Sequence, residues 1–203
     1  MSTLVVIAKE CLPGRVKTRL TPALSPEAAA DVAAAALAAT LEAAARVPAD
    51  RHLLFLDGLP PAGCDIEVLH QPPGTLDARL AALFDAVDDR TLVIGMDTPQ
   101  VDPAVLTGVL EDPSGADAWF GPAADGGFWA LGLDAPTGAL LTGVPMSTPW
   151  TGAVQRARLA AAGLRIRDLP LLTDVDTIAT AREVAALLPG TRFAGLIRER
   201  DAA

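Results

Sequence analysis

The residues of this chain that could do chemistry gather in one basic loop near its start and in several separate acidic turns. The basic loop holds both lysines of the 203-residue sequence, Lys9 and Lys17, together with Arg15 and Arg19. The whole chain has a formal net charge of −9, so this cluster of cations runs against the general balance. Cations concentrated in one loop indicate an anionic ligand, with chance clustering as the alternative.

The basic loop has the parts needed to hold a polyphosphate. Gly14 allows the backbone to come close to a ligand. Lys17 offers a point charge, Arg19 offers a planar fork of donors, and Thr18 can add a hydroxyl. The loop is not a Walker A motif, because no Gly-Lys-Ser/Thr segment opens a helix at the required spacing. We therefore predict that the loop neutralises a bound triphosphate, and a solvated basic loop is the alternative.

Asp97 comes directly after the apolar, β-branched segment 91–95. A carboxylate in that place lies where a buried strand ends, which suits a magnesium ligand. The alternative is a helix cap for the segment that starts near Val101, although Asp102 is better placed for that task.

Asp174 and Asp176 are two residues apart. In extended backbone both side chains point to the same side, so both could reach one metal ion or a pair of ions. Asp176 could instead cap the following helix, and Thr177 competes for that position. The pair by itself predicts a metal site only weakly.

A third group is the glycine-rich turn 121–127, which contains Asp125, Gly126 and Gly127. Adjacent glycines allow a backbone shape that leaves room for a ligand. We predict that this turn binds an acceptor molecule, and Asp125 could also contact a metal. The alternative is a tight hairpin with Trp129 in the core.

The elements that must position these residues alternate between strands and helices. Pro26 and Glu27 follow the natural N-cap Ser25 and open the first helix. The tail from Pro189 is expected to be mobile at its end. Periodicity predicts strands at 3–8, 51–57, 66–69, 91–95, 116–120, 127–133 and 165–169, and helices at 26–46, 76–87, 103–110, 151–162 and 178–188.

This alternation predicts a single α/β domain over residues 1–203, with helices on both faces of a mainly parallel sheet. Ligands of such sheets bind beyond the carboxyl ends of the strands. The loop that contains Lys17, the turn at Asp97 and the turn at Asp125 are therefore expected to lie near one another.

Composition excludes several classes of protein. Hydrophobic residues make up 51% of the chain, which is enough for a core, and no apolar stretch is suited to span a membrane. The acidic balance argues against binding to nucleic acid or anionic membranes. Cys11 and Cys64 form no zinc or disulfide motif, and the start of the chain lacks a signal-peptide pattern, so we expect a cytoplasmic protein. His52 and His70 have no partner motif, so no catalytic triad is assigned.

Four motifs follow one another along the chain, in the segments 8–20, 95–99, 121–128 and 174–177. In this order they resemble the DUF2064 family, whose members are identified as nucleotide-diphospho-sugar transferases or GT-A-type glycosyltransferases. More distantly, the chain is similar to the 2-phospholactate and phosphoenolpyruvate guanylyltransferases of coenzyme F420 biosynthesis. The resemblance covers nearly the whole chain.

This resemblance implies a GT-A, Rossmann-like fold of three layers, α/β/α, around a mixed and mainly parallel sheet. It implies that the metal ligands are Asp97, Asp174 and Asp176, and that Lys17 and Arg19 contact phosphates. The residues expected to bind the nucleotide are Ala8, Lys9, Gly14, Lys17, Thr18 and Arg19.

We therefore expect a transferase that depends on Mg²⁺ or Mn²⁺ and moves a nucleoside monophosphate from a nucleoside triphosphate to a phosphorylated small-molecule acceptor. Lys17, Arg19 and Asp97 are its expected catalytic residues. One alternative is a glycosyltransferase that uses a nucleotide sugar as donor. Another is a nucleotide-binding protein without turnover. The oligomeric state stays open.

Overall fold

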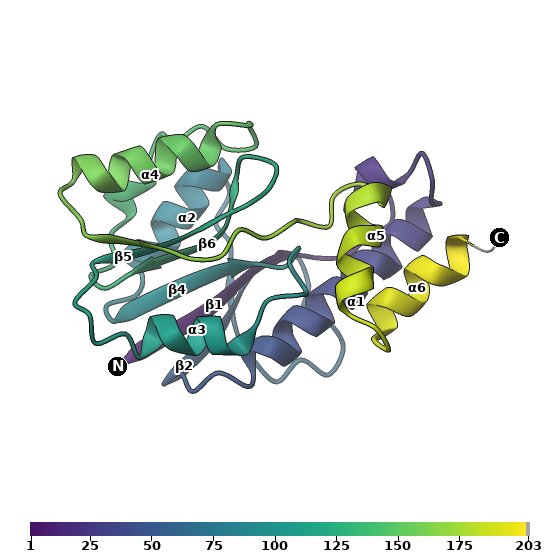
Figure 1. Cartoon of the computed structure of the whole chain (residues 1–203), viewed down its shortest axis with the longest axis horizontal. Coiled ribbons are helices and arrows are strands. Elements are labelled where there is room, and N and C mark those ends of the chain that lie inside the picture. The colour runs from purple at the N-terminus through teal and green to yellow at the C-terminus, as the bar shows by residue number, and fades with distance from the viewer. Residues whose placement is uncertain (202–203) are drawn as a thin grey trace.

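The computed structural model describes residues 1–201, with side chains for residues 1–199. It contains a seven-stranded sheet with the order β3-β2-β1-β4-β6-β5-β7 (Figure 1). The strands are β1 (Ser2–Lys9), β2 (Arg51–Asp57), β3 (Glu67–His70), β4 (Arg90–Gly95), β5 (Ala118–Pro122), β6 (Phe128–Leu133) and β7 (Ile166–Asp168).

The central part of the sheet is parallel. Strand β1 pairs in parallel with β2 and β4, and β2 pairs in parallel with β3. Strand β6 runs antiparallel to β4 and β5, and β7 pairs in parallel with β5. The expectation of a mixed, mainly parallel α/β sheet is confirmed. As a result, the carboxyl ends of β1, β2, β3 and β4 share one edge of the sheet.

Helices cover both faces of the sheet, as expected for three layers (Figure 1). Helices α1 and α3 pack on one face and α2 and α4 on the other, each through its own apolar cluster. The helices are α1 (Pro26–Ala44), α2 (Leu76–Asp85), α3 (Pro103–Leu110), α4 (Thr151–Ala161), α5 (Ile178–Leu187) and α6 (Arg192–Asp201), with 3-10 turns η1 (Thr18–Leu20) and η2 (Gly138–Leu140).

The helix caps settle two alternatives that the sequence leaves open. The Asp102 carboxylate accepts a hydrogen bond from the Ala104 N–H at 2.8 Å and caps α3. Thr177 caps α5 through a capping box with Thr180. Asp97 and Asp176 therefore cap neither helix, and their carboxylates are free for other contacts.

Helix α6 is an element that the sequence analysis missed. The mobility expected at the end of the tail concerns residues that lie outside the described part of the chain. Before that end, Phe193, Ala194 and Ile197 are buried against α1 and α5. Their spacing places all three on one helix face, which buries apolar area that an isolated tail could not. Figure 1 shows α5 and α6 beside α1 at one end of the molecule.

Two smaller expectations also change. Strand β5 starts at Ala118 rather than at residue 116. The sequence favours core or pocket-wall positions for all three tryptophans. Trp119 and Trp129 are buried, whereas Trp150 is 57% exposed. No helix within residues 1–201 is both long and apolar enough to cross a membrane.

The packing of α6 can be tested with Phe193→Ala. Phe193 is 1% exposed, so its truncation should lower the free energy of unfolding by about 3 kcal/mol. The matched control is Leu187→Ala at the end of α5, where the side chain is 66% exposed and the loss should stay below about 0.5 kcal/mol. Urea unfolding followed by circular dichroism measures both. Equal losses in the two variants would contradict the observed packing of α6.

Candidate functional site

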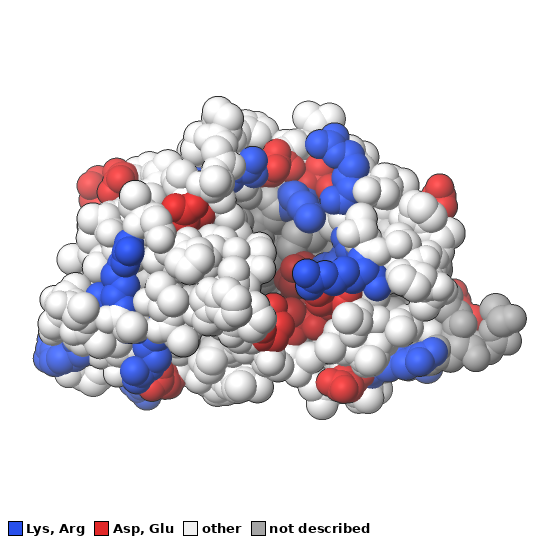
Figure 2. Space-filling model, turned by 90° about the horizontal axis from the view of Figure 1, so that it is seen from above, with Lys and Arg blue, Asp and Glu red and all other residues white. Residues whose placement is uncertain are grey.

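A cavity of about 520 Å³ lies at the carboxyl edge of the sheet, where β1 and β4 end. Seen from above, the molecule is hollowed near its middle, and acidic and basic side chains gather around the hollow (Figure 2). Of the site residues expected from the sequence, those that line the cavity are Ala8, Lys9, Asp97, Asp125, Gly127 and Asp174. Those that do not are Gly14, Lys17, Thr18, Arg19, Gly126 and Asp176.

Lys17 joins the basic loop to the two acidic segments that contain Asp97 and Asp176. Its ammonium nitrogen lies 2.7 Å from Oδ2 of Asp97 and 3.9 Å from Oδ1 of Asp176. Lys17 is only 8% exposed, and its φ of 50° places the backbone in the left-handed region that few residues other than glycine adopt. The loop is therefore docked on the acids here rather than solvated, and three segments far apart in the chain meet at one ammonium group.

Arg19 makes a second ion pair between the same two regions. Its guanidinium donates a hydrogen bond to Oδ2 of Asp176. This bond and the charge of Asp176 raise the pKa of Arg19 above its usual value. Gly14 and Thr18 lie on the exposed part of the loop, outside the cavity.

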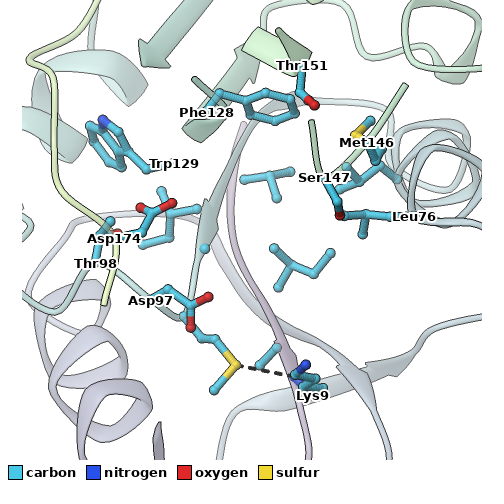
Figure 3. A pocket seen from close by; sticks show the side chains of 18 of the residues that line it. Lys9, Leu76, Asp97, Thr98, Phe128, Trp129, Met146, Ser147, Thr151 and Asp174 are labelled. Carbon is cyan, nitrogen blue, oxygen red and sulfur yellow. Dashed lines mark hydrogen bonds between the residues drawn. The ribbon is translucent and has the colours of Figure 1, made fainter. Parts of the chain in front are cut away.

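Two of the three carboxylates expected to bind metal, those of Asp97 and Asp174, lie in the cavity wall. The backbone N–H of Val175 donates to the carbonyl oxygen of Asp97 at 2.9 Å, which holds the segment around Asp174 against the turn at the end of β4. Figure 3 shows Asp97, Thr98 and Asp174 on the same side of the cavity. Among the described residues, neither Oδ1 of Asp97 nor the buried Thr98 hydroxyl has a hydrogen-bond partner.

The electrostatics of the site favour a bound cation. Burial raises the pKa of Asp174 to about 7, and the negative charges of Asp125, Asp97 and Asp176 add to this rise. Lys17 opposes it only in part. The site thus holds more carboxylates than its own cations neutralise.

The chemistry of these donors fits Mg²⁺ or Mn²⁺. Carboxylate oxygens are the ligands that these hard cations prefer, and the unpartnered Oδ1 of Asp97 offers a buried acceptor. Within the part of the chain that the structure describes, no three acidic, histidine or cysteine side chains form a complete metal site. Magnesium sites often need only one or two carboxylates, because phosphates of the substrate and water complete the coordination.

The turn around Asp125 has a structural task as well as a place in the cavity. Oδ1 of Asp125 accepts a hydrogen bond from the Gly127 N–H at 2.8 Å. Gly126 has a φ of 89°, and a Cβ there would overlap the carbonyl oxygen of Pro149. Gly126 therefore has the structural role that the hairpin alternative gives to this turn. Asp125 and Gly127 nevertheless line the cavity.

Two groups of cavity residues were missed by the sequence analysis. One is a polar network in which the Arg79 guanidinium donates to Asp57 at 2.7 Å and to the Gln71 side-chain oxygen at 3.1 Å. Asp57 ends β2, and Gln71 directly follows β3, so the rule for strand ends could have found them. The other group is the loop 146–148 before α4, and no local pattern indicated it.

The sequence profile of the DUF2064 family, described as an uncharacterized protein conserved in bacteria, matches residues 24–148. The chain belongs to the DUF2064 family. The matched stretch of this DUF2064 chain contains Asp97 and Asp125, whereas Lys17, Asp174 and Asp176 lie outside it. No curated protein matches the chain significantly.

Solved structures share the fold. A proposed nucleotide-diphospho-sugar transferase from Desulfovibrio desulfuricans G20 has 24% identity and a TM-score of 0.88, over 99% of this chain and 95% of that protein. Rv0371c of Mycobacterium tuberculosis H37Rv, solved in complex with manganese, has 23% identity and a TM-score of 0.55, over 90% and 96%. A CMP:2-keto-3-deoxy-manno-octonic acid synthetase complexed with CTP has 16% identity and a TM-score of 0.55, over 92% and 98%. The fold is therefore the GT-A-like fold of nucleotidyltransferases.

The raised pKa of Asp174 predicts how stability depends on pH in the metal-free protein. Because the folded pKa of about 7 lies above the unfolded value, this group stabilises the fold below about pH 4. That contribution is lost as the pH rises through 7. Asp174→Asn should therefore be more stable than the parent by about 2 kcal/mol at pH 8, with little difference at pH 4. Urea unfolding at both values measures this, and an equal difference at the two values would contradict it.

Removal of the Lys17 charge should destabilise the protein. Lys17→Met leaves Asp97 and Asp176 without their shared ammonium, and we expect a loss of about 3 kcal/mol in the free energy of unfolding. Lys9→Met is the control, since Lys9 is exposed and its loss should cost less than about 0.5 kcal/mol. Chemical denaturation of both variants decides between a structural ion pair and a solvated loop.

Proposed function

We propose that this protein is a divalent-metal-dependent nucleotidyltransferase that moves a nucleoside monophosphate from a nucleoside triphosphate to a phosphorylated small-molecule acceptor. The observation that carries the proposal is the contact of Lys17 with both Asp97 and Asp176 beside the cavity. Cations for phosphates and carboxylates for a metal are thus adjacent at the sheet edge where nucleotides bind in α/β folds.

The cations of this edge suit a triphosphate. Lys9 lines the cavity, and no described acidic side chain forms an ion pair with it. Lys17 and Arg19 are paired with the carboxylates of Asp97 and Asp176. When a metal ion and phosphates enter, the carboxylates can bind the metal and the two cations can bind the phosphates. The charge of a triphosphate is larger than that of a nucleotide sugar, and the number of nearby cations favours the triphosphate as donor.

The proposed reaction is an in-line displacement at phosphorus. An oxygen of the acceptor's phosphate forms a bond to the α-phosphorus, the bond from that phosphorus to the bridging oxygen breaks, and pyrophosphate leaves with the bond electrons. Lys9, Lys17 and Arg19 neutralise the charge on the departing pyrophosphate, and no nucleophile of the protein is required.

Asp97 and Asp174, whose side chains line the cavity, would hold the metal, and Asp176 would join them once Lys17 and Arg19 pair with phosphates instead. When bound there, Mg²⁺ or Mn²⁺ supplies Lewis-acid stabilisation of the phosphate charge. The raised pKa of Asp174 means that it is partly protonated near neutral pH, so the metal would bind more tightly as the pH rises.

A second candidate is glycosyl transfer from a nucleotide sugar. It is favoured by the relative from Desulfovibrio desulfuricans G20, which carries the name of a nucleotide-diphospho-sugar transferase. In that reaction the acceptor oxygen attacks the sugar, and a nucleoside diphosphate leaves. The same carboxylates and cations would stabilise the leaving group.

The leaving group distinguishes the candidates. The protein is incubated with Mg²⁺, with each nucleoside triphosphate or nucleotide sugar, and with a panel of phosphorylated and sugar acceptors. Release of pyrophosphate supports nucleotidyl transfer, and release of a nucleoside diphosphate supports glycosyl transfer. Tight binding of nucleotide without turnover under every condition would instead favour a binding protein.

Asp97→Asn should abolish metal-dependent nucleotide binding and leave the fold intact. We expect the affinity for the Mn²⁺-nucleotide complex to fall by at least about a hundredfold, measured by isothermal titration calorimetry. Asp102→Asn is the control, since Asp102 caps α3 and does not line the cavity. Undiminished binding by the Asp97 variant would remove this carboxylate from the proposed site.

A further inference from the structure

The cavity has two chemically different ends. Asp97 and Asp174 lie at one end, and Leu76, Phe128 and Met146 form an apolar wall at the other (Figure 3). These three side chains come from α2, from the start of β6 and from the loop before α4. A ligand that fills both ends of the cavity would therefore have two chemically different parts. A charged part would lie beside Asp97 and Asp174, and an uncharged part would lie against the apolar wall.

The apolar end has no free cation of its own. Among the described residues that line the cavity, the cations are Lys9 and Arg79. Arg79 lies on α2 near Leu76, but its guanidinium already donates to Asp57 at 2.7 Å and to the carbonyl oxygen of Gly74 at 3.0 Å. A second anionic group of a ligand would thus find no unpaired positive charge at this end.

Besides the paired side chains of Arg79, Asp57 and Gln71, this end of the cavity has hydroxyl groups on the loop before α4 and on the first residue of that helix. Ser147 lines the cavity with a φ of 59°, an unusual backbone state for a residue other than glycine, and such strain often accompanies function. The Thr151 hydroxyl donates to the carbonyl oxygen of Pro145 at 2.8 Å and so fixes the loop. The Ser147 hydroxyl has no partner among the described residues and is available to a ligand.

The loop is also joined to the turn around Asp125. The Gly152 N–H donates to the carbonyl oxygen of Gly126 at 2.8 Å, and a Cβ on Gly126 would overlap Pro149. Asp125 therefore stays at the cavity while the loop stays in place.

We propose that this end of the cavity binds the body of the acceptor, and that this body is uncharged and hydroxylated, as in a sugar phosphate. The inference rests on the proposed function and names its acceptor class. The carbon–hydrogen face of a sugar packs on Phe128 and Met146, and its hydroxyls exchange hydrogen bonds with Ser147. A phosphorylated carboxylic acid is disfavoured, because its carboxylate would lose water beside apolar side chains without gaining a cation.

A matched pair of probes tests this class. Glucose 1-phosphate and glucuronic acid 1-phosphate share a skeleton and differ in one group, a hydroxymethyl or a carboxylate; the galactose and galacturonic acid pair repeats the comparison. Calorimetry measures their binding to the protein loaded with Mn²⁺ and a non-hydrolysable nucleoside triphosphate. We expect the neutral member of at least one pair to bind at least about tenfold more tightly.

A substitution then reverses the preference. Met146→Arg places a cation at the apolar end and should improve binding of the carboxylated probe by about tenfold relative to the neutral one. Trp150→Arg adds the same charge to an exposed position that does not line the cavity, and it should leave the ratio unchanged.

The outcomes separate this inference from the proposed function. If no nucleotide binds with Mn²⁺, the proposed function fails. If nucleotide binds but the carboxylated probes bind as tightly as the neutral ones, or no sugar phosphate binds at all, the acceptor class is wrong and the proposed function stands. An equal effect of Met146→Arg and Trp150→Arg would likewise overturn the placement of the acceptor.

Discussion

The structure of the site depends on one buried ammonium group. Lys17 lies 2.7 Å from Asp97 and 3.9 Å from Asp176, and it joins the loop after β1 to the turn after β4 and to the segment before α5. Without a cation in this place, the carboxylates of Asp97 and Asp176 would repel each other, and the loop after β1 would lose the contact that joins it to both acids. Burial, and after it the charges of Asp125 and Asp97, raise the pKa of Asp174, and Lys17 opposes this rise only in part. The folded chain therefore contains a place where additional positive charge is favourable, which is the physical basis of a metal and nucleotide site.

The helices α3 and α5 hold Asp97 and Asp176 in position but take their N-cap hydrogen bonds from other residues. Asp102 and Thr177 satisfy the first turns of α3 and α5, so Asp97 and Asp176 remain available. Val175, between the two later acids, is fully buried in the apolar cluster formed by α1, α5 and α6. Its backbone N–H also donates to Asp97. The packing of the C-terminal helices thus fixes the segment 174–176 against the end of β4, and core stability and site geometry depend on the same contacts.

The glycine-rich turn shows that structural and functional interpretations need not exclude each other. Gly126 is required because its backbone packs tightly on Pro149, whereas Asp125 and Gly127 line the cavity. The same packing fixes the loop that contains Ser147. One wall of the cavity is therefore preorganised by backbone contacts, which lowers the entropy lost when a ligand binds.

The sequence alone determined the alternation of strands and helices, the caps at Ser25 and Asp102, and the identity of the acidic and basic segments, because these depend on local spacing and on the rule for strand ends. Tertiary structure decided what local pattern cannot encode. It buried Lys17 between two acids, exposed Trp150 and ordered α6, since each outcome depends on surfaces supplied by distant segments. It also made the two ends of the cavity different, because Leu76, Phe128 and Met146 meet only when α2, β6 and the loop before α4 pack on the same face of the sheet.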